Sequence, residues 1–370
     1  MYSYWENKYW FKHYDYVIVG SGIVGLTTAL LIKQKNVHKS VMIVDRSQIP
    51  QGASTKNAGF ACFGTVGEII DDLERISRDE MKSIIKLRWD GLQKLKSIHE
   101  PALIDYQELG GYEVFENDDQ YEKCSGKIND INQLIYDSIG LEEVFTTRST
   151  DMNDKFHDRM IYNRYEGQLN PVLLVNSLIS KIRMLGVQMS LGIVIEDITA
   201  QGSLKQLKTN IGIDIVATNV IFCTNAFIGK IYPELDVIPA RNQVLVTEKL
   251  NDLPVIGTYH FDKGYIYFRN IDNRLLIGGA RNLDLITEQT MEFGKNDFIF
   301  NELKNFIETR IVQKKVIIDY QWSGIIATGN SKKPILRKVE DGIYLAVRLG
   351  GMGVAIGSEL AFQLSKMLDE

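Results

Sequence analysis

The first part of the chain alternates between short apolar stretches and one longer helical stretch. Residues 16–19 and 41–44 are apolar and rich in β-branched side chains, which is typical of strands buried on both faces. Residues 23–33 between them carry the apolar pattern of a helix. A strand, a helix and a second strand within about 30 residues form the building block of a parallel sheet. This part therefore predicts an α/β fold.

Helical segments and short strands follow in the middle of the chain. Residues 71–99 have apolar positions at helical spacing among many charges, and Pro101 ends this amphipathic segment. Asn170 and Pro171 are typical of a helix start, and the helical pattern continues over 172–185. Short strands are predicted at 193–195, 204–209, 212–218 and 220–223.

The last third of the chain has an antiparallel pattern. Residues 265–269 and 275–278 flank an Asp272-Asn273 turn and predict a β-hairpin. A final strand at 343–347 leads through a glycine cluster into a helix at 355–368. The predicted architecture is a doubly wound, Rossmann-like α/β domain with a second, mainly antiparallel α+β domain.

Length and composition agree with two ordinary globular domains. The chain has 370 residues, 45% of them hydrophobic and 24% charged, which excludes a disordered or fibrous protein. The formal net charge of -5 argues against a nucleic-acid partner, because such proteins usually carry a basic excess.

The cysteines and one apolar run indicate where the protein is located and whether it binds a metal. Cys62, Cys124 and Cys223 are scattered and form neither a paired motif nor a cluster with histidine, so we expect a reducing, cytoplasmic location and no metal site. The apolar run 17–32 is shorter than the roughly 20 residues that cross a bilayer. Charged residues at 33–39 stand where a signal peptide would be cleaved.

A glycine motif between the first strand and the first helix predicts a nucleotide site. Gly20 permits a tight turn, Gly22 allows the backbone to approach a pyrophosphate, and Gly25 allows the helix to pack on the strand. The helix N-terminus would hold the pyrophosphate, and Asp45 would accept hydrogen bonds from the ribose. Asp45 disfavours a 2′-phosphate, whereas the neighbouring Arg46 keeps NADP as an alternative. The motif does not distinguish NAD from FAD. The predicted contacts are Gly20, Ser21, Gly22, Ile23, Val24, Gly25, Asp45 and Arg46.

A second glycine cluster occurs near the end of the chain. It follows a strand and opens a helix, but the residues after Gly357 are too few for another strand with its acidic residue. A complete second dinucleotide site is therefore excluded. The helix N-terminus suits an electron-rich ring system such as the isoalloxazine of a flavin. The predicted contacts are Gly351, Met352, Gly353 and Val354.

Several further motifs resemble one known family along nearly the whole chain. They are the loop 52–59, the helix entry at 167–171, the segment VIFCTNAF at 220–227, the Pro-x-Arg-x-Gln pattern at 239–243, and Trp322-Ser323-Gly324 followed by Thr328 and Pro334. Together they resemble the FAD-dependent oxidoreductase family of D-amino-acid oxidase, glycine oxidase, sarcosine oxidase and gamma-glutamylputrescine oxidase.

The resemblance implies FAD as cofactor and assigns parts of the chain. The FAD-binding domain would comprise 1–75, 160–238 and 325–370, and the substrate domain 76–159 and 239–324. Further FAD contacts would be Ser54, Thr55, Lys56, Asn57, Ala58, Gly59, Val194, Thr224 and Asn225. The family transfers a hydride from a carbon bearing nitrogen to the flavin, which gives an imine. The partner would be a small amine or amino acid, with the electron acceptor left open.

The chain departs from the family pattern at positions that bind the substrate in relatives. Two arginines that bind the substrate carboxylate in relatives align with Ile326 and Gly351 here. Arg348 is the candidate for a relocated anion contact, and the alternative is a salt-bridged arginine at a strand end. Tyr267 and Arg269, with Tyr265, would share one strand face, which is either the substrate side or a solvated surface. The predicted catalytic residues are Arg348, Arg269 and Tyr267.

Other features leave the chemistry open. Cys62 lies in the predicted flavin loop, but such a cysteine is most often a small core residue. An oxygen-activating lysine of sarcosine-oxidase relatives aligns with Leu276, which argues against fast reaction with oxygen. Oxidation of a hydroxy acid and a non-catalytic accessory flavoprotein are the alternative functions.

Overall fold

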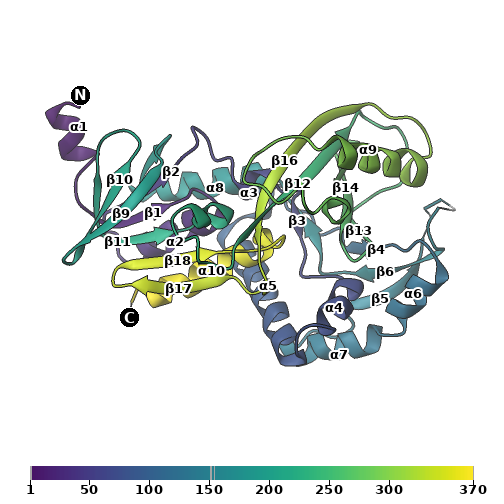
Figure 1. The fold of residues 1–370 in the computed structure, drawn as a ribbon. Coiled ribbons are helices and arrows are strands. Elements are labelled where there is room, and N and C mark those ends of the chain that lie inside the picture. The colour runs from purple at the N-terminus through teal and green to yellow at the C-terminus, as the bar shows by residue number, and fades with distance from the viewer. Residues whose placement is uncertain (1, 151, 154, 370) are drawn as a thin grey trace. The chain divides into compact units, whose positions relative to one another are not determined.

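The chain forms two compact units in the computed structural model, which describes residues 2–150, 152–153 and 155–369. The first unit comprises the described residues of Met1–Thr55, Pro171–Pro239 and Ile326–Glu370, and the second comprises those of Lys56–Asn170 and Ala240–Ile325 (Figure 1). The predicted two-part α/β architecture is confirmed.

The boundaries between the units differ from the predicted domain boundaries. Residues 56–75 and 160–170, which the sequence suggested for the FAD-binding part, belong to the second unit. The reason is long-range pairing: β3 (Phe60–Ala61) pairs with β7 (Gly167–Gln168), and α4 (Val66–Leu73) contacts helices of the same unit. Such pairings leave no local signal in the sequence.

The first unit is built on a sheet with the strand order β17-β18-β11-β1-β2-β8. Neighbours from β18 to β8 are parallel, whereas β17 is antiparallel to β18, and β10 and β9 extend the sheet beside β11. The strands are β1 (Tyr14–Val19), β2 (Val41–Asp45), β8 (Gln188–Leu191), β9 (Ile195–Gln201), β10 (Leu204–Thr209), β11 (Ile215–Phe222), β17 (Ile335–Glu340) and β18 (Ile343–Val347).

One correction concerns β11. The sequence predicted two strands at 212–218 and 220–223, but they form one continuous strand. Its first half pairs with β10 and its second half with β18. The prediction separated the two segments at the polar Asn219, whose side-chain amide donates to the carbonyl of Asp15.

Helix α2 (Ile23–Lys35) is the central helix of the first unit. It is apolar on all sides, and residues 23–33 are buried, as expected for a helix that is covered on every side. It contacts α10 (Gly353–Met367) and α8 (Pro171–Met184). The short helical segments of this unit are α1 (Tyr4–Tyr9), α3 (Ala53–Lys56, which ends at the boundary) and η2 (Asn225–Lys230).

The second unit has a mainly antiparallel sheet with the strand order β16-β12-β15-β14-β13-β4-β6-β5. The predicted hairpin is present, and its turn residues Asp272 and Asn273 both have positive φ. The strands are β4 (Gly111–Glu113), β5 (Phe145–Ser149), β6 (Arg159–Asn163), β12 (Ile238–Thr247), β13 (Thr258–Phe261), β14 (Ile266–Ile271), β15 (Arg274–Gly279) and β16 (Ile318–Thr328).

Two apolar clusters involve this sheet. The larger one joins Phe268 and neighbouring strand residues to α9 (Asp297–Phe306) and the π-helical turn Ile307–Ile311. The smaller one contains Ala58, Val244, Val246 and Leu276, with Phe60, Tyr267, Ile271 and Trp322 against it. The other helices are α5 (Arg78–Ile98), η1 (Pro101–Ile104), α6 (Asp118–Ser125), α7 (Ile128–Ile139) and η3 (Arg281–Leu283).

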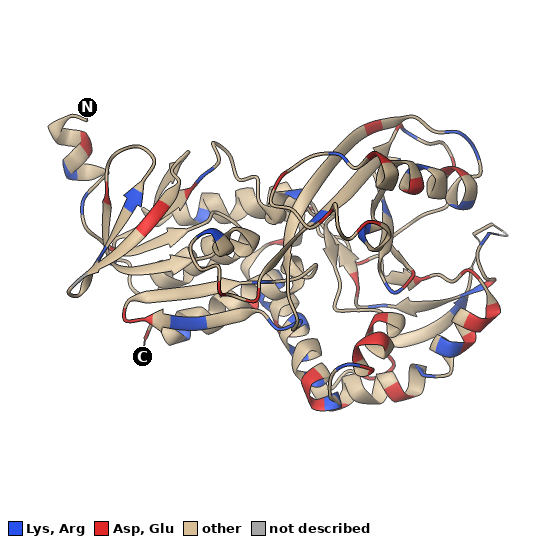
Figure 2. Ribbon diagram, viewed as in Figure 1, with Lys and Arg blue, Asp and Glu red and all other residues tan. Residues whose placement is uncertain are grey.

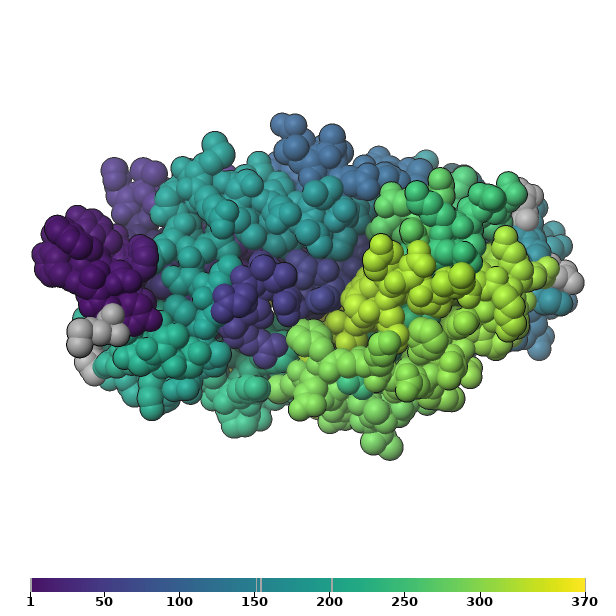
Figure 3. Space-filling model, turned by 90° about the horizontal axis from the view of Figure 1, so that it is seen from above, coloured from purple at the N-terminus to yellow at the C-terminus, as the bar shows by residue number. Residues whose placement is uncertain are grey.

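The surface of both units is mixed in charge, and the N-terminal segment exposes aromatic side chains. Acidic and basic positions are interspersed in both units (Figure 2). The N-terminal segment, purple in Figure 3, lies at the surface, and Tyr4, Trp5, Tyr9 and Trp10 are exposed. Within the described ranges, no helix is long and apolar enough to cross a membrane.

Asp15 at the start of β1 provides a pH-dependent tie to the residue before β2. Its carboxylate accepts hydrogen bonds from the backbone and hydroxyl of Ser40 and from Lys39. Burial opposes ionisation, but these donors outweigh it and lower the pKa of Asp15 from 3.8 to about 2. The folded state is therefore favoured above the ordinary pKa, and this contribution is lost as the pH falls towards 2.

We expect Asp15→Asn to lower the free energy of unfolding by about 1–2 kcal/mol at neutral pH. The difference from wild type should shrink between pH 5 and pH 3, as measured by urea unfolding. Asp214→Asn, at an exposed carboxylate of the same unit, serves as the control and should change stability little at either pH. A difference that is constant over this pH range would contradict the assignment.

Candidate active site

The turn between β1 and α2 brings backbone close to backbone. Gly20 has a φ of 113°, and a Cβ there would lie 2.7 Å from the carbonyl oxygen of Cys223. A Cβ at Gly25 would overlap the carbonyl oxygen of Gly20. Both positions therefore require glycine. Gly22 precedes α2 and has no side-chain cap, so the first turn of the helix offers N–H groups and the positive end of its dipole.

Asp45 and Ser54 lie beside this turn. Oδ2 of Asp45 accepts hydrogen bonds from the backbone N–H of Ser21 at 2.8 Å and from its hydroxyl at 2.7 Å. The Ser54 hydroxyl accepts the N–H of Ile23 at 3.0 Å. Each carboxylate oxygen can accept more than one hydrogen bond, so Asp45 retains capacity for a ribose hydroxyl.

Among the other predicted FAD contacts of the first unit, some polar groups already have hydrogen-bond partners in the protein and others do not. Oγ1 of Thr224 is buried and has no partner among the described residues, which suits a ligand. Asn225 has a φ of 48°, and its Oδ1 accepts the N–H of Leu349 at 3.3 Å. Arg46 lies over the ring of Phe227. Val194 is exposed, and its N–H and carbonyl both bond to Asn210.

The remaining predicted contacts lie in two loops. Thr55 donates its hydroxyl to the carbonyl of Pro50. Gly350 adopts a positive φ, and the exposed Gly351 and partly buried Met352 follow it. Gly353 and Val354 then begin α10. The predicted helix N-terminus after the glycine cluster is present, and it has no side-chain cap.

Trp322 and Arg269 of the second unit hold the main chain of loop residues 56–59. Nε1 of Trp322 donates to the carbonyl of Lys56 at 2.9 Å. Nε of Arg269 donates to the carbonyl of Ala58 at 2.6 Å, and its Nη2 donates to the carbonyl of Leu169 at 3.2 Å. Within the loop, the N–H of Gly59 bonds to Oδ1 of Asn57. Residues from β14 and β16 thus fix the main chain of this loop.

Arg269 is a buried cation. It is 4% exposed, and within the described part of the chain it forms no ion pair. Burial lowers the pKa of Arg269 to about 10, so the guanidinium stays protonated near neutral pH. Two of its five N–H donors bond to main-chain carbonyls. The alternative of a solvated surface is therefore wrong for this residue.

Tyr267 lies two residues before Arg269 on β14. Its ring is 5.3 Å from the ring of Phe60 in an edge-to-face arrangement. Burial raises the pKa of Tyr267 to about 12, so its hydroxyl remains a hydrogen-bond donor. Tyr265 precedes β14 and is 40% exposed, so the predicted alternation of three residues on one face is limited to Tyr267 and Arg269.

Arg348 forms hydrogen bonds and a salt bridge within the first unit, which is the structural role that the sequence analysis gave as its alternative. Its Nε and Nη2 donate to the carbonyl of Lys333, at 3.1 and 2.8 Å. Its Nη1 donates to both the carbonyl and the carboxylate of Asp236, at 2.8 and 2.6 Å. All three nitrogens are engaged, so the suggestion that Arg348 is a relocated anion contact is corrected: it is a salt-bridged arginine at the end of β18.

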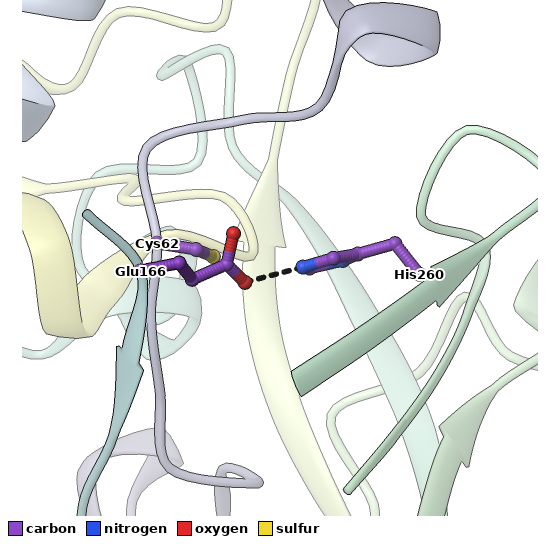
Figure 4. Close-up of side chains that lie close together, drawn as sticks. All are labelled: Cys62, Glu166 and His260. Carbon is purple, nitrogen blue, oxygen red and sulfur yellow. Dashed lines mark hydrogen bonds and ion pairs between the residues drawn. The ribbon is translucent and has the colours of Figure 1, made fainter. Parts of the chain in front are cut away.

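Sequence reasoning missed a buried group that includes Cys62. The thiol of Cys62, the carboxylate of Glu166 and the ring of His260 lie close together in the second unit (Figure 4). Burial raises the pKa of the Cys62 thiol well above its usual value. Burial alone would lower the pKa of His260, but the Glu166 carboxylate raises it. The three residues are far apart in the sequence, and no spacing motif could have linked them.

The residues of the first unit fit FAD. A turn without Cβ atoms lies at the N-terminus of α2, an acceptor lies at the end of β2, and Thr224 has a buried hydroxyl without a described partner. These are the features by which an α/β unit binds a dinucleotide. The site is thus that of a dinucleotide-dependent α/β enzyme.

Comparison with known proteins identifies the family. The profile described as FAD dependent oxidoreductase matches residues 15–367, so the chain belongs to this family and FAD is its cofactor. It is an enzyme, which removes the alternative of an accessory flavoprotein.

The chain is similar to individual members of known activity. It is 24% identical to gamma-glutamylputrescine oxidoreductase of Escherichia coli, over 92% of this chain and 80% of that protein. The fold is similar to glycine oxidase from Geobacillus kaustophilus, with a TM-score of 0.77, 16% identity and coverage of 96% and 95% of the two chains. It is also similar to L-alpha-glycerophosphate oxidase from Mycoplasma pneumoniae, with a TM-score of 0.75, 14% identity and coverage of 97% and 95%.

We expect Gly25→Ala to prevent stoichiometric FAD binding, because the added methyl group would overlap the Gly20 carbonyl and distort the turn. The measurement is the ratio of flavin absorbance to protein in the purified variant. Gly52→Ala is the matched control, because a Cβ at Gly52 meets nothing within 4 Å. Full flavin occupancy in Gly25→Ala would show that this turn does not hold the cofactor.

Proposed function

We propose that the enzyme oxidises the CH–NH bond of a small amino acid or amine to an imine. FAD supplies the hydride acceptor when it is bound. Water would then hydrolyse the imine outside the redox step. The proposal rests on what the face of the second unit around Tyr267 and Arg269 offers to a substrate.

That face offers hydrogen-bond donors, and the imidazole nearest to it is already engaged. Tyr267 and Arg269 both keep their protons near neutral pH. His260 lies opposite Tyr267 in the β13–β14 ladder, and its ring pairs with the Glu166 carboxylate. Oxidation of an alcohol requires removal of the hydroxyl proton, usually by a positioned base, whereas a neutral amine has a free electron pair on nitrogen and needs none. The similarity to gamma-glutamylputrescine oxidoreductase supports nitrogen over oxygen.

Arg269 supports a substrate with a carboxylate. The Arg269 guanidinium bonds to two neutral carbonyls and forms no ion pair within the described chain, although Asp105 and Asp272 favour its charged form from beyond ion-pair distance. An anion in direct contact would balance this buried charge. The remaining N–H donors of Arg269 suit the planar, bidentate geometry of a carboxylate. The Tyr267 hydroxyl can donate a further hydrogen bond, and the surrounding apolar side chains exclude water. The role of these residues is to orient the substrate.

A hydroxy acid is the second candidate, because the same arginine would bind its carboxylate. Matched sets of compounds separate the possibilities: an amino acid, the hydroxy acid with the same side chain, and the amine that lacks the carboxylate. Each is mixed with the FAD-loaded enzyme without oxygen, and loss of the oxidised-flavin absorbance is followed. We expect reduction by one amino acid, slower reduction by its amine and none by its hydroxy acid. Reduction by hydroxy acids alone would contradict the proposal.

We expect Arg269→Met to remove most of the preference for the amino acid over the matched amine. Loss of one partner of a buried charge pair costs about 2–5 kcal/mol, and this should appear in the ratio of the two flavin-reduction efficiencies. A ratio is used because it does not depend on how much enzyme carries FAD. Arg274→Met on the adjacent strand β15, where Arg274 pairs with Asp319, is the control and should keep the ratio. An unchanged ratio in Arg269→Met would assign Arg269 a purely structural role.

A further inference from the structure

Cys62, Glu166 and His260 converge in the interior of the second unit. Their exposed fractions are 8%, 1% and 7%, and their thiol, carboxylate and imidazole donor atoms all lie within 4.8 Å of one another. His260 is on β13, Glu166 directly precedes β7, and Cys62 directly follows β3 (Figure 4). Three segments of the chain thus present one sulfur, one oxygen and one nitrogen donor to the same point.

The surroundings hold two of these side chains in place. Glu166 forms an ion pair with Nε2 of His260, and the Thr258 hydroxyl donates to Oε1 of Glu166 at 2.9 Å. Thr258 and His260 alternate on β13, and His260 lies opposite Glu113 in the ladder with β4. Partners of this kind orient the ligands of metal sites in proteins.

An independent observation concerns Tyr106. Its hydroxyl is buried and has no hydrogen-bond partner among the described residues. A Cβ at Gly167, next to Glu166, would lie 3.0 Å from that hydroxyl, so the phenol borders the backbone beside the cluster. A buried polar atom without a partner indicates a missing ligand or water.

We propose that Cys62, Glu166 and His260 form a binding site for one divalent transition-metal ion, with Zn²⁺ as the reference ion. Bonds from the metal to its ligands in a tetrahedral site are about 2.0–2.3 Å long. After small side-chain rotations, the three donor atoms of this cluster can reach one ion at these distances. Binding replaces the thiol proton of Cys62 and any proton on Nε2 of His260, and these protons pass to solvent. The ion–ligand bonds join the three segments.

The donor set determines the class of ion. A thiolate and an imidazole select borderline ions such as Zn²⁺, Co²⁺ and Fe²⁺, whereas Ca²⁺ and Mg²⁺ prefer sites made of oxygen atoms only. This departs from the expectation of no metal site, which rested on the absence of a sequence motif. The proposal does not depend on the proposed substrate, because none of the three ligands has a role in the proposed substrate binding.

The test uses the full-length, FAD-loaded protein after treatment with a chelator. Co²⁺ is the probe, because its d–d bands lie at longer wavelengths than oxidised-flavin absorption and a thiolate ligand adds a charge-transfer band. We expect one Co²⁺ per chain with a thiolate band, and its displacement by equimolar Zn²⁺. Thr258→Val should weaken binding by about 10- to 100-fold, as changes to residues that orient ligands do.

Cys62→Ser should abolish the charge-transfer band, whereas Cys124→Ser should keep it. Cys124 is the matched control, because it is equally buried and does not belong to the cluster. His260→Gln provides a second ligand variant, and circular dichroism reports whether each variant is folded. The proposal is overturned if wild type binds no Co²⁺ in a saturable manner, if the cobalt spectrum lacks a thiolate band, or if folded Cys62→Ser or folded His260→Gln binds Co²⁺ as wild type does.

Discussion

The hydrogen bonds of the buried Arg269 guanidinium are the interaction on which the proposed substrate face of the second unit depends. Burying a charge is costly, and here main-chain carbonyls from Ala58 and Leu169 replace part of its hydration. These bonds tie β14 to two distant segments of the chain. The close approach requires Gly59 with a φ of 77°, because a Cβ there would overlap the Leu169 carbonyl. The same cation is left without a carboxylate partner in the described chain, which connects the packing of the loop to substrate choice.

Each of the two units has physical properties of its own. The first provides backbone N–H groups, a helix dipole and the Asp45 carboxylate, which suit a pyrophosphate and a ribose. The second provides protonated donors beside an apolar cluster, with the paired imidazole of His260 opposite Tyr267. The proposed hydride removal from a neutral amine depends on position and exclusion of water more than on proton transfer.

Local patterns in the sequence predicted local structure well, and distant contacts escaped them. The β1–α2–β2 unit and the 272–273 turn follow from apolar spacing and turn residues within a few positions of each other. The pairing of β3 with β7 and the ion pair of Arg348 with Asp236 join residues about a hundred positions apart, so they left no local trace. For the same reason Cys62, Glu166 and His260 could not be recognised as one cluster. Charge and hydropathy also could not show that Arg269 is buried and Tyr265 exposed.

Product analysis tests the central claim, oxidation of a carbon–nitrogen bond, most directly. The FAD-loaded enzyme is reduced without oxygen by a substrate in excess, and the products are quantified against the flavin reduced. The account predicts one carbonyl compound and one ammonia or amine for each flavin, as imine hydrolysis requires. A carbonyl product formed with neither ammonia nor a newly exposed amine would contradict it and would identify the enzyme as an alcohol-oxidising member of the family.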